Sequence, residues 1–403
     1  MKNTNNKDIL WNRNYISILI ANCFVSISFF ILNPTFPVYI KSLINDLSIV
    51  GLISSLFLIS AMLIRPFSGY LTDIYNKRKI FIGGLFILCI SIVGYIFLNT
   101  IPGIIFARLL HGIGMGLATT AFGALAAQNI PPARMGEGMG YYGLGMVFGM
   151  SIGPSIGIQL LNSYSAKVAF GVAGGFSILG VILIVSIYRK RNSSNLNIPK
   201  PSIPRNIGAF FNIEKSAMIP ASLIFFIGII VSAITTYLVL FSIDRGISNI
   251  GFFFTIQSAA VLLSRLVNGR IADKKGYRTV IVPSIMCLIS AMVLLFFATT
   301  PIFFMITAFL YGLGYGTLTS ACQALSVLKA KPEKRGLAIS TYYLGMDAGN
   351  GFGTILCGII SKMFGYAEMY LLSVIPLLIG LMIYLFWSGD SRNHSGISKA
   401  SLL

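Results

Sequence analysis

The feature that most constrains this chain is a succession of long apolar runs, separated by charged or turn-forming residues. About 20 apolar residues are needed for a helix to cross the hydrocarbon core of a bilayer. Twelve runs approach or exceed that length, six in each half of the chain. Their limits are 15–40, 48–71, 80–98, 101–122, 138–161, 166–187, 217–241, 250–271, 279–298, 301–325, 337–361 and 367–387. The predicted fold class is an all-α membrane protein with twelve transmembrane helices.

The composition supports a membrane protein. Only 10% of the 403 residues are charged, whereas a soluble domain carries about 25%. A soluble enzyme of this length would need more polar surface than these residues supply. The sequence shows neither a nucleophile–base pair nor a cluster of metal ligands. We therefore predict no enzymatic activity, no cofactor and no metal site.

The distribution of Lys and Arg predicts the orientation in the membrane. Basic residues concentrate on the side of the N-terminus, for example in segments 77–79, 189–215 and 329–335. The loops on the opposite side hold only Lys41, Lys167, Arg245 and Lys362. Because cytoplasmic loops carry the excess of basic residues, both termini are predicted to be cytoplasmic in a multi-pass protein of the cell membrane. The net charge of +19 then reflects topology, and no nucleic-acid partner is predicted.

The two halves of the chain are related by an internal repeat at an offset of 200 residues. Without a gap, this register aligns Arg65 with Arg265, Asp73 with Asp273, Thr119 with Thr319, and glycines 69, 145, 149 and 153 with glycines 269, 345, 349 and 353. Two six-helix units in the same orientation form a parallel repeat, an arrangement common in secondary transporters. The fold is therefore predicted to consist of two six-helix bundles.

The repeat also defines the domain organisation. Residues 1–188 form the N-terminal bundle, and 216–388 form the C-terminal bundle. Residues 189–215 are basic, rich in Ser and Asn, and include three prolines. Such a segment cannot bury enough apolar surface to fold alone, so it is interpreted as a cytoplasmic linker. The polar segment 389–403 is interpreted as a cytoplasmic tail.

A repeated loop motif carries the first resemblance to a known family. Residues 69–79 read GYLTDIYNKRK, and residues 269–278 read GRIADKKGYR. Both resemble the G-x-L-x-D-R-x-G-R-[RK] loop of the major facilitator superfamily, and the whole chain is similar to its twelve-span drug:proton antiporters. The resemblance implies cytoplasmic gate loops that include Gly69, Asp73, Arg78, Gly269, Asp273 and Arg278. A loop that only fixes topology is the alternative.

The residue types in this loop suit such a role. Gly69 permits close approach of two helices, and the carboxylate of Asp73 can cap the N-terminus of a neighbouring helix. The first copy departs from the family pattern at Ile74 and at Asn76. Asn76 stands where glycine is usual and is expected to tolerate a left-handed turn.

The fifth span contains the most specific motif. Gly140, Gly149, Gly153, Pro154 and Gly157 reproduce the spacing G-x8-G-x3-G-P-x2-G of the antiporters, although the family's final glycine is isoleucine here. Glycines at four-residue spacing allow another helix to pack backbone to backbone, and the proline can bend the span. The resemblance associates the motif with export by exchange. Ordinary close packing is the alternative.

Three ionisable residues inside the spans are candidates for proton coupling. Arg108 lies in an R-x-x-x-G-x-G segment that resembles the same family, which implies a role in coupling; snorkelling to the membrane edge is the alternative. His111 can titrate near neutral pH or simply pack. Asp347 is expected to carry a proton or to pair with Arg65, Arg265 or Arg108. A static ion pair is the alternative for Asp347.

Glu137 follows Arg134 by three residues. Because both are expected at the cytoplasmic entry to the fifth span, we predict a solvent-exposed ion pair that contributes little to stability.

The family architecture implies a central cavity between spans one, four, seven and ten. The candidate substrate-binding residues are Asn22, Asn33, Arg65, Tyr237, Arg265, Tyr311 and Tyr315. Aromatic rings with few polar groups suit a bulky amphipathic solute, whereas three buried arginines beside one acid suit an anionic solute. The sequence leaves this choice open.

The function predicted from these observations is proton-coupled export of small organic molecules by alternating access. The expected partners are the lipid bilayer, a small-molecule substrate and protons as the coupling ion, and the protein is expected to function as a monomer. An uptake symporter and an exporter of an anionic metabolite or metallophore are the alternatives within this class. A non-transporting membrane sensor is the alternative from another class.

Overall fold

The computed structural model describes residues 10–43, 47–188, 213–247 and 250–390. These residues form helices and no strand. The first half contains α1 (Arg13–Leu43), α2 (Leu47–Ile74), α3 (Lys77–Phe97), α4 (Ile101–Asn129), α5 (Met135–Ser163) and α6 (Ala166–Tyr188). The second half contains α7 (Met218–Asp244), α8 (Gly251–Lys275), α9 (Arg278–Phe296), α10 (Pro301–Lys329), α11 (Arg335–Phe364), α12 (Tyr366–Leu372) and α13 (Val374–Asp390). Single turns of 3-10 helix occupy Pro132–Arg134, Lys215–Ala217 and Pro332–Lys334.

The structure confirms the predicted all-helical membrane fold. Most helices extend a few residues beyond the apolar runs, because polar residues continue the helix outside the hydrocarbon layer. The predicted twelfth span is divided at Ser373 into α12 and α13. Among the described residues, ten spans are long and apolar enough to cross a membrane by composition alone. Two further long helices are α2, which carries Arg65, and α11, which carries Asp347. The expected linker and tail fall mainly on 189–212 and 391–403, outside the described residues.

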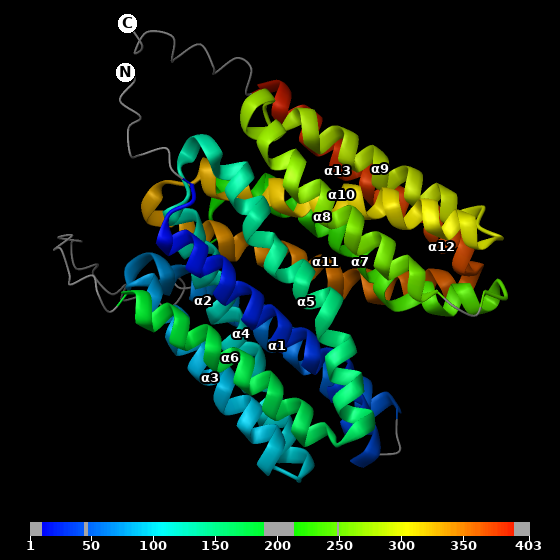
Figure 1. Ribbon diagram of the computed structural model, residues 1–403. Coiled ribbons are helices and arrows are strands. Elements are labelled where there is room, and N and C mark those ends of the chain that lie inside the picture. The colour runs from blue at the N-terminus through cyan, green and yellow to red at the C-terminus, as the bar shows by residue number, and fades with distance from the viewer. Residues whose placement is uncertain (1–9, 44–46, 189–212, 248–249, 391–403) are drawn as a thin grey trace, which may run out of the picture.

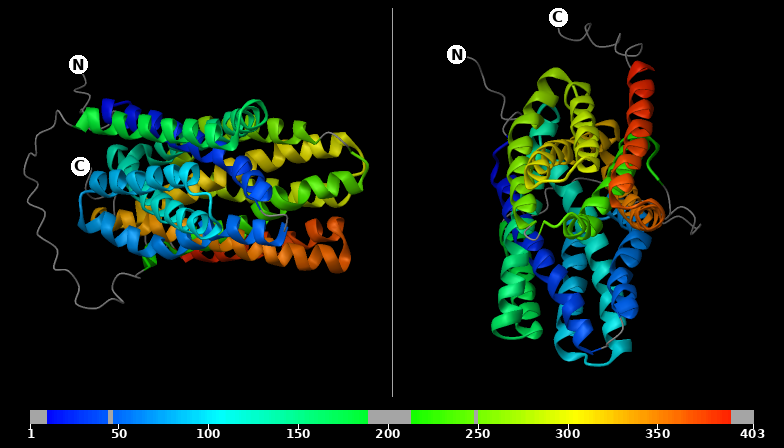
Figure 2. Two further views of the ribbon diagram at one scale, coloured as in Figure 1. Left: turned by 90° about the horizontal axis from the view of Figure 1, so that it is seen from below. Right: turned by 90° about the vertical axis from the view of Figure 1, so that its right-hand side faces the viewer.

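The helices pack as two bundles that repeat the same contacts. In the first bundle α1 packs on α5, while α4 packs on both α2 and α3; in the second, α7 packs on α11, while α10 packs on α8 and α9. The bundles meet at the end of the molecule where α1 begins and α13 ends, and their helices diverge toward the other end (Figures 1 and 2). Helix α5 of the first bundle contacts α8 of the second, and α11 contacts α2 in the same way.

The glycine stripe of the fifth span lies against α1. A Cβ atom added to Gly149 would lie 2.7 Å from the backbone carbonyl carbon of Ser26, and one added to Gly157 would lie 2.6 Å from the carbonyl oxygen of Ile31. Both distances are too short for non-bonded atoms, so only glycine fits. In the second bundle, Gly345, Gly349 and Gly353 of α11 approach the backbone of α7 equally closely. The backbone-to-backbone packing expected from the glycine spacing is therefore present in both bundles, and α5 bends in its second half, which contains Pro154 (Figure 1).

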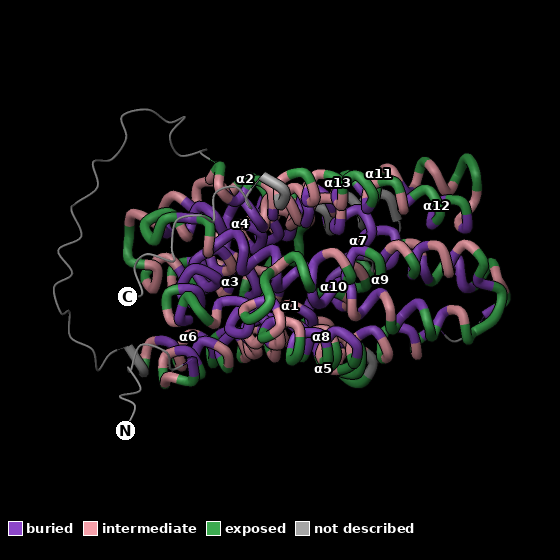
Figure 3. The backbone as a smooth tube through the Cα atoms, turned by 90° about the horizontal axis from the view of Figure 1, so that it is seen from above, coloured by how far each residue is buried: buried purple, intermediate pink, exposed green. Residues whose placement is uncertain are grey.

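The outer surface of the bundles is apolar. Large side chains such as Phe86, Phe106 and Ile355 are 65%, 61% and 67% exposed. Buried residues face the interior of the bundles, and exposed ones lie on the outer faces and at the helix ends (Figure 3). An apolar surface of this extent is what contact with lipid requires.

The two copies of the loop motif turn in different ways. Gly276 has a φ of +90° after α8, a conformation that glycine adopts without steric cost. Asn76 has a φ of −60°, and its side chain caps α3 by accepting a hydrogen bond from the backbone N–H of Arg78. Asn76 therefore does not use the left-handed conformation that it was expected to tolerate, because its side chain caps a helix N-terminus instead.

Candidate functional site

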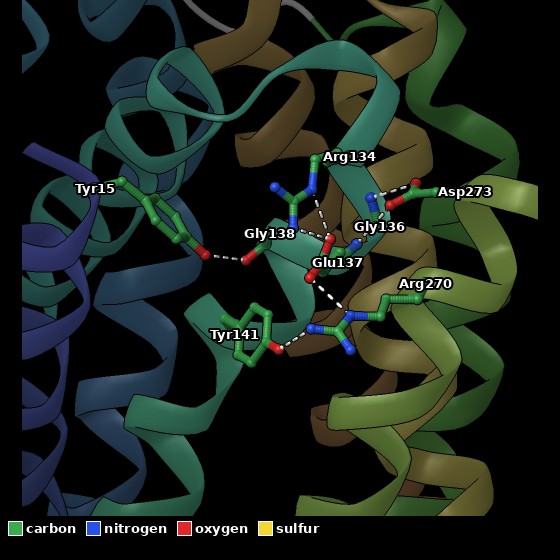
Figure 4. Close-up of polar contacts among 8 residues, drawn as sticks. All are labelled: Tyr15, Arg134, Gly136, Glu137, Gly138, Tyr141, Arg270 and Asp273. Atoms are coloured by element: carbon green, nitrogen blue, oxygen red, sulfur yellow. Dashed lines mark hydrogen bonds and ion pairs between the residues drawn. The ribbon is translucent and has the colours of Figure 1, made fainter. Parts of the chain in front are cut away.

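Two carboxylates join the bundles at the end where they meet. Asp273, near the end of α8, accepts hydrogen bonds from the backbone N–H groups of Gly136 (2.7 Å) and Glu137 (2.8 Å) at the start of α5 (Figure 4). In the other copy, Asp73 of α2 accepts equivalent bonds, of 2.6 and 2.8 Å, from the backbone at the start of α11. The unpaired N–H groups and the dipole of a helix N-terminus favour an anion. We call these two symmetric contacts the interbundle latch.

Glycines allow the latch to form. A Cβ atom on Gly269 would lie 2.8 Å from the Cα atom of Glu137, and one on Gly136 would lie 2.8 Å from the carbonyl oxygen of Gly269. Gly69 and Gly336 cross in the same way in the other copy. Gly136 and Gly336 were not among the predicted site residues. Their match at the 200-residue offset, just before two glycine-rich spans, was the signal that could have identified them.

Glu137 strengthens one side of the latch. It is only 5% exposed and forms ion pairs with Arg134 of its own bundle (2.7 Å) and Arg270 of the other bundle (2.8 Å). Arg270 also donates a hydrogen bond to the hydroxyl of Tyr141 (3.1 Å; Figure 4). The predicted solvent-exposed Glu137 pair is therefore wrong, because the approach of α8 buries the carboxylate between two arginines.

This ion pair exists in one copy only. At the 200-residue offset, Leu337 replaces Glu137 and Tyr70 replaces Arg270. The latch therefore combines two equivalent helix-terminus contacts with one interbundle ion pair.

Two predicted loop residues lie away from the latch contacts. The guanidinium of Arg78 donates a hydrogen bond to the carbonyl oxygen of Val185 (3.2 Å), at the end of α6 in its own bundle. Arg278 is exposed at the start of α9. Their proposed part in a gate stays a prediction.

A buried ion pair connects the bundles deeper in the membrane. Arg65 of α2 and Asp347 of α11 are 6% and 7% exposed, and the Nε atom of Arg65 donates to the carboxylate. Arg65 also donates to the hydroxyl of Thr119 (3.1 Å), and its guanidinium lies 4.5 Å from the ring centroid of Tyr343. Of the three arginines considered as partners of Asp347, Arg65 is the one that contacts it.

Arg265 occupies the equivalent position in the second copy without an acidic partner. It is 4% exposed and donates to the hydroxyl of Thr319 (3.1 Å), as Arg65 does to its threonine. Among the described residues, no carboxylate oxygen lies within 4.0 Å of its guanidinium. The position that corresponds to Asp347 is Val147.

Arg108 and His111 lie in α4 inside the first bundle. The guanidinium of Arg108 is 4.0 Å from the ring centroid of Phe36 and 5.0 Å from that of Phe57. Nδ1 of His111 is hydrogen-bonded to the hydroxyl of Tyr95 (3.0 Å). Both side chains are buried, so Arg108 does not snorkel to the membrane edge in this state. A role of either residue in proton coupling stays a prediction.

The remaining cavity candidates differ in exposure. Asn22 is buried and donates to the carbonyl oxygen of Tyr142 on α5 (2.6 Å). Tyr311 and Tyr315 stack in the core of the second bundle, with ring centroids 5.7 Å apart. Tyr237 is partly exposed, with its hydroxyl bonded to a carbonyl of α11, and Asn33 is exposed. Their contact with a substrate stays a prediction.

Two repeated helical bundles, joined at one end by a latch and within the membrane by an ion pair, define a polytopic membrane transporter. The family model described as Major Facilitator Superfamily matches residues 18–253 and 246–401. The chain belongs to the Major Facilitator Superfamily.

Several relatives are similar over almost their whole length. An uncharacterized MFS-type transporter of Methanocaldococcus jannaschii is 27% identical, over 87% of this chain and 92% of its own. The multi-drug resistance efflux pump PmrA of Streptococcus pneumoniae is 26% identical, over 90% of this chain and 93% of its own. Multidrug resistance protein 2 of Bacillus subtilis is 24% identical, over 97% of this chain and 100% of its own.

Solved structures share the fold. The human organic anion transporter MFSD10 superposes with a TM-score of 0.75 at 15% identity, covering 92% of this chain and 98% of that chain. A bacterial homologue of the iron transporter ferroportin in its outward-facing state superposes with a TM-score of 0.77 at 11% identity, covering 94% of this chain and 100% of that chain. At these identities the likeness concerns the fold alone.

Proposed function

We propose that this protein is a proton-coupled exporter of small organic molecules that works by alternating access. Its membrane fold and its relatives among multidrug efflux pumps support export. The observation that carries the proton-coupling part is the buried pair of Arg65 and Asp347, because its two members belong to different bundles.

The interbundle location makes this pair a switch. While Asp347 is ionised, its carboxylate holds α11 against Arg65 on α2 and so holds the two bundles together. A proton on Asp347 removes the charge, so the attraction is lost and the bundles can separate, which returns the guanidinium of Arg65 to water. A titrating group inside the membrane can thereby bias two conformations.

The Lys and Arg distribution orients this cycle. With both termini in the cytoplasm, the latch closes the cytoplasmic side, and the structure corresponds to the state that is closed to the cytoplasm. An external proton then reaches Asp347 and releases the bundles, and the proton leaves on the cytoplasmic side. Solute moves outward on the return step, so the exchange is an antiport.

The test is flux in proteoliposomes that contain the purified protein. A pH gradient should drive efflux of at least one solute from a panel of organic cations, such as ethidium, and organic anions, such as 1-naphthoate, and dissipating the gradient should abolish it. Asp347→Asn should abolish gradient-driven transport but retain solute counterflow, which needs no proton. Asp244→Asn, at an exposed acid of α7, is the matched control and should leave transport unchanged. Unchanged driven efflux in Asp347→Asn would remove this residue from the mechanism, and a gradient that drives solute inward would instead indicate an uptake symporter.

A further inference from the structure

The buried arginine has different neighbours in the two copies of the repeat. Arg65 and Arg265 lie at equivalent positions, and each donates to the equivalent threonine at 3.1 Å. Within the described part of the chain, only Arg65 is paired with a carboxylate, which Asp347 supplies. Arg265 is a buried cation, and the residue at the position that corresponds to Asp347 is the uncharged Val147; a buried charge without a counter-charge is unfavourable.

The neighbouring residues show a second difference. The ring of Tyr343 covers the guanidinium of Arg65 at 4.5 Å. Its counterpart is Gly143, and a Cβ atom added there would overlap the guanidinium of Arg265. The Nε atom of Arg265 is buried and makes no hydrogen bond. Among the described residues, the second copy therefore lacks the acid and has glycine in place of the ring that covers Arg65, and the Nε–H donor of Arg265 has no partner.

This difference points to a ligand. We propose that Arg265 binds the carboxylate of an anionic organic solute. In the second copy, this carboxylate would occupy the position that the Asp347 carboxylate has in the first copy. An arginine guanidinium matches a carboxylate in charge and in hydrogen-bond geometry. This assignment rests on the proposed function as a transporter, and it narrows the substrate class to solutes that carry a carboxylate.

The fold supplies a route by which the solute reaches Arg265. Arg265 belongs to α8, and the glycine against its guanidinium belongs to α5 of the other bundle. It lies eight residues from the latch carboxylate Asp273, or roughly 12 Å along the helix. When the latch opens and the bundles separate, α5 leaves α8 and uncovers the guanidinium on the side of the latch. An anionic solute would therefore bind from that side.

The test uses the full-length protein in lipid nanodiscs, with 1-naphthoate as the probe and 1-naphthamide as its neutral counterpart. Wild type should bind 1-naphthoate in preference to the amide. Arg265→Gln should bind 1-naphthoate at least about tenfold more weakly, because the charge-assisted bonds are lost. Val147→Asp should have the same effect, because it supplies an internal carboxylate that competes with the solute. Val147→Asn, similar in size but uncharged, should retain binding, and the amide should bind all variants alike.

Thermal unfolding separates this effect from misfolding. Val147→Asp should unfold at a higher temperature than Val147→Asn, because it gives Arg265 a partner, so its loss of binding cannot reflect instability. Binding of 1-naphthoate to Arg265→Gln within about twofold of wild type, a difference well below 1.4 kcal/mol, would overturn the assignment. Proton-driven ethidium efflux without any preference for 1-naphthoate would overturn this inference alone. Binding of 1-naphthoate without gradient-driven flux or counterflow would overturn the exporter proposal alone.

Discussion

The interbundle latch makes a quantitative prediction for Asp273→Asn. The carboxylate accepts two backbone hydrogen bonds at 2.7 and 2.8 Å from the N-terminus of α5. The amide retains one acceptor oxygen and places an NH2 group toward the second N–H donor, so one charge-assisted bond is lost. Such a bond contributes about 1.5–3 kcal/mol, and the helix dipole adds about 0.3–1 kcal/mol. We expect a loss of roughly 2–4 kcal/mol from the latched state.

This free energy corresponds to a change of roughly 30- to 900-fold in the ratio of open to latched molecules. A protein that is about 1% open, within the usual range for a minor state, would become roughly 25–90% open. Pulsed electron paramagnetic resonance measures this change as a distance distribution. Spin labels at Lys79 of the first bundle and Lys275 of the second, both exposed, would report separation after the five native cysteines are replaced.

The controls separate the latch from a general effect of charge. Asp73→Asn removes the equivalent contact with α11 and should shift the distribution in the same direction. Asp244→Asn makes the same chemical change at an exposed acid outside the latch and should leave it unchanged. If Asp273→Asn leaves the distance distribution as in wild type, the reasoning that the latch stabilises this state is refuted.

Two further changes test the packing and the asymmetry of the latch. Gly149→Val should destabilise the first bundle by about 1–3 kcal/mol through overpacking, because the added side chain meets the backbone of α1. Thermal unfolding measures this loss of stability. The control is Gly175→Val, which should destabilise the bundle less, because no neighbouring atom lies within 4 Å of the added Cβ atom. Equal loss in both variants would contradict the packing account. Arg270→Ala should open the latch less than Asp273→Asn does, because the arginine side chain is 56% exposed. The effect of Arg270→Ala should also become smaller at high salt. An effect in the same distance measurement that equals that of Asp273→Asn, or that does not depend on salt, would contradict this ranking.

Local patterns explain why much of the fold was predictable. The length of an apolar run determines whether a helix can span a bilayer, and this information is present in each segment separately. The glycine spacing of α5 predicted its close packing because the distance between turns of a helix is constant. Ser373, where the last span is divided, stands three residues before Pro376; a proline inside an apolar run is a local signal for a helix break, and the prediction of one continuous span did not use it.

The site was predictable only in part, as two acids illustrate. Asp73 was expected at a helix N-terminus, and it lies there. Glu137 was assigned to its sequence neighbour Arg134, and the assignment missed Arg270, which is 133 residues away along the chain. Sequence proximity identifies partners within one helix turn, whereas the partner in another bundle depends on how the bundles dock.

The sequence by itself determined the membrane class, the succession of spans and the repeat, because each follows from residue type and spacing along the chain. Only the tertiary structure decided which of three buried arginines meets Asp347, and that Arg265 contacts no acid of the segments that the structure describes. These choices depend on the register between α2 and α11 and between α5 and α8. That register is set by the docking of two whole bundles, to which many distant contacts contribute together.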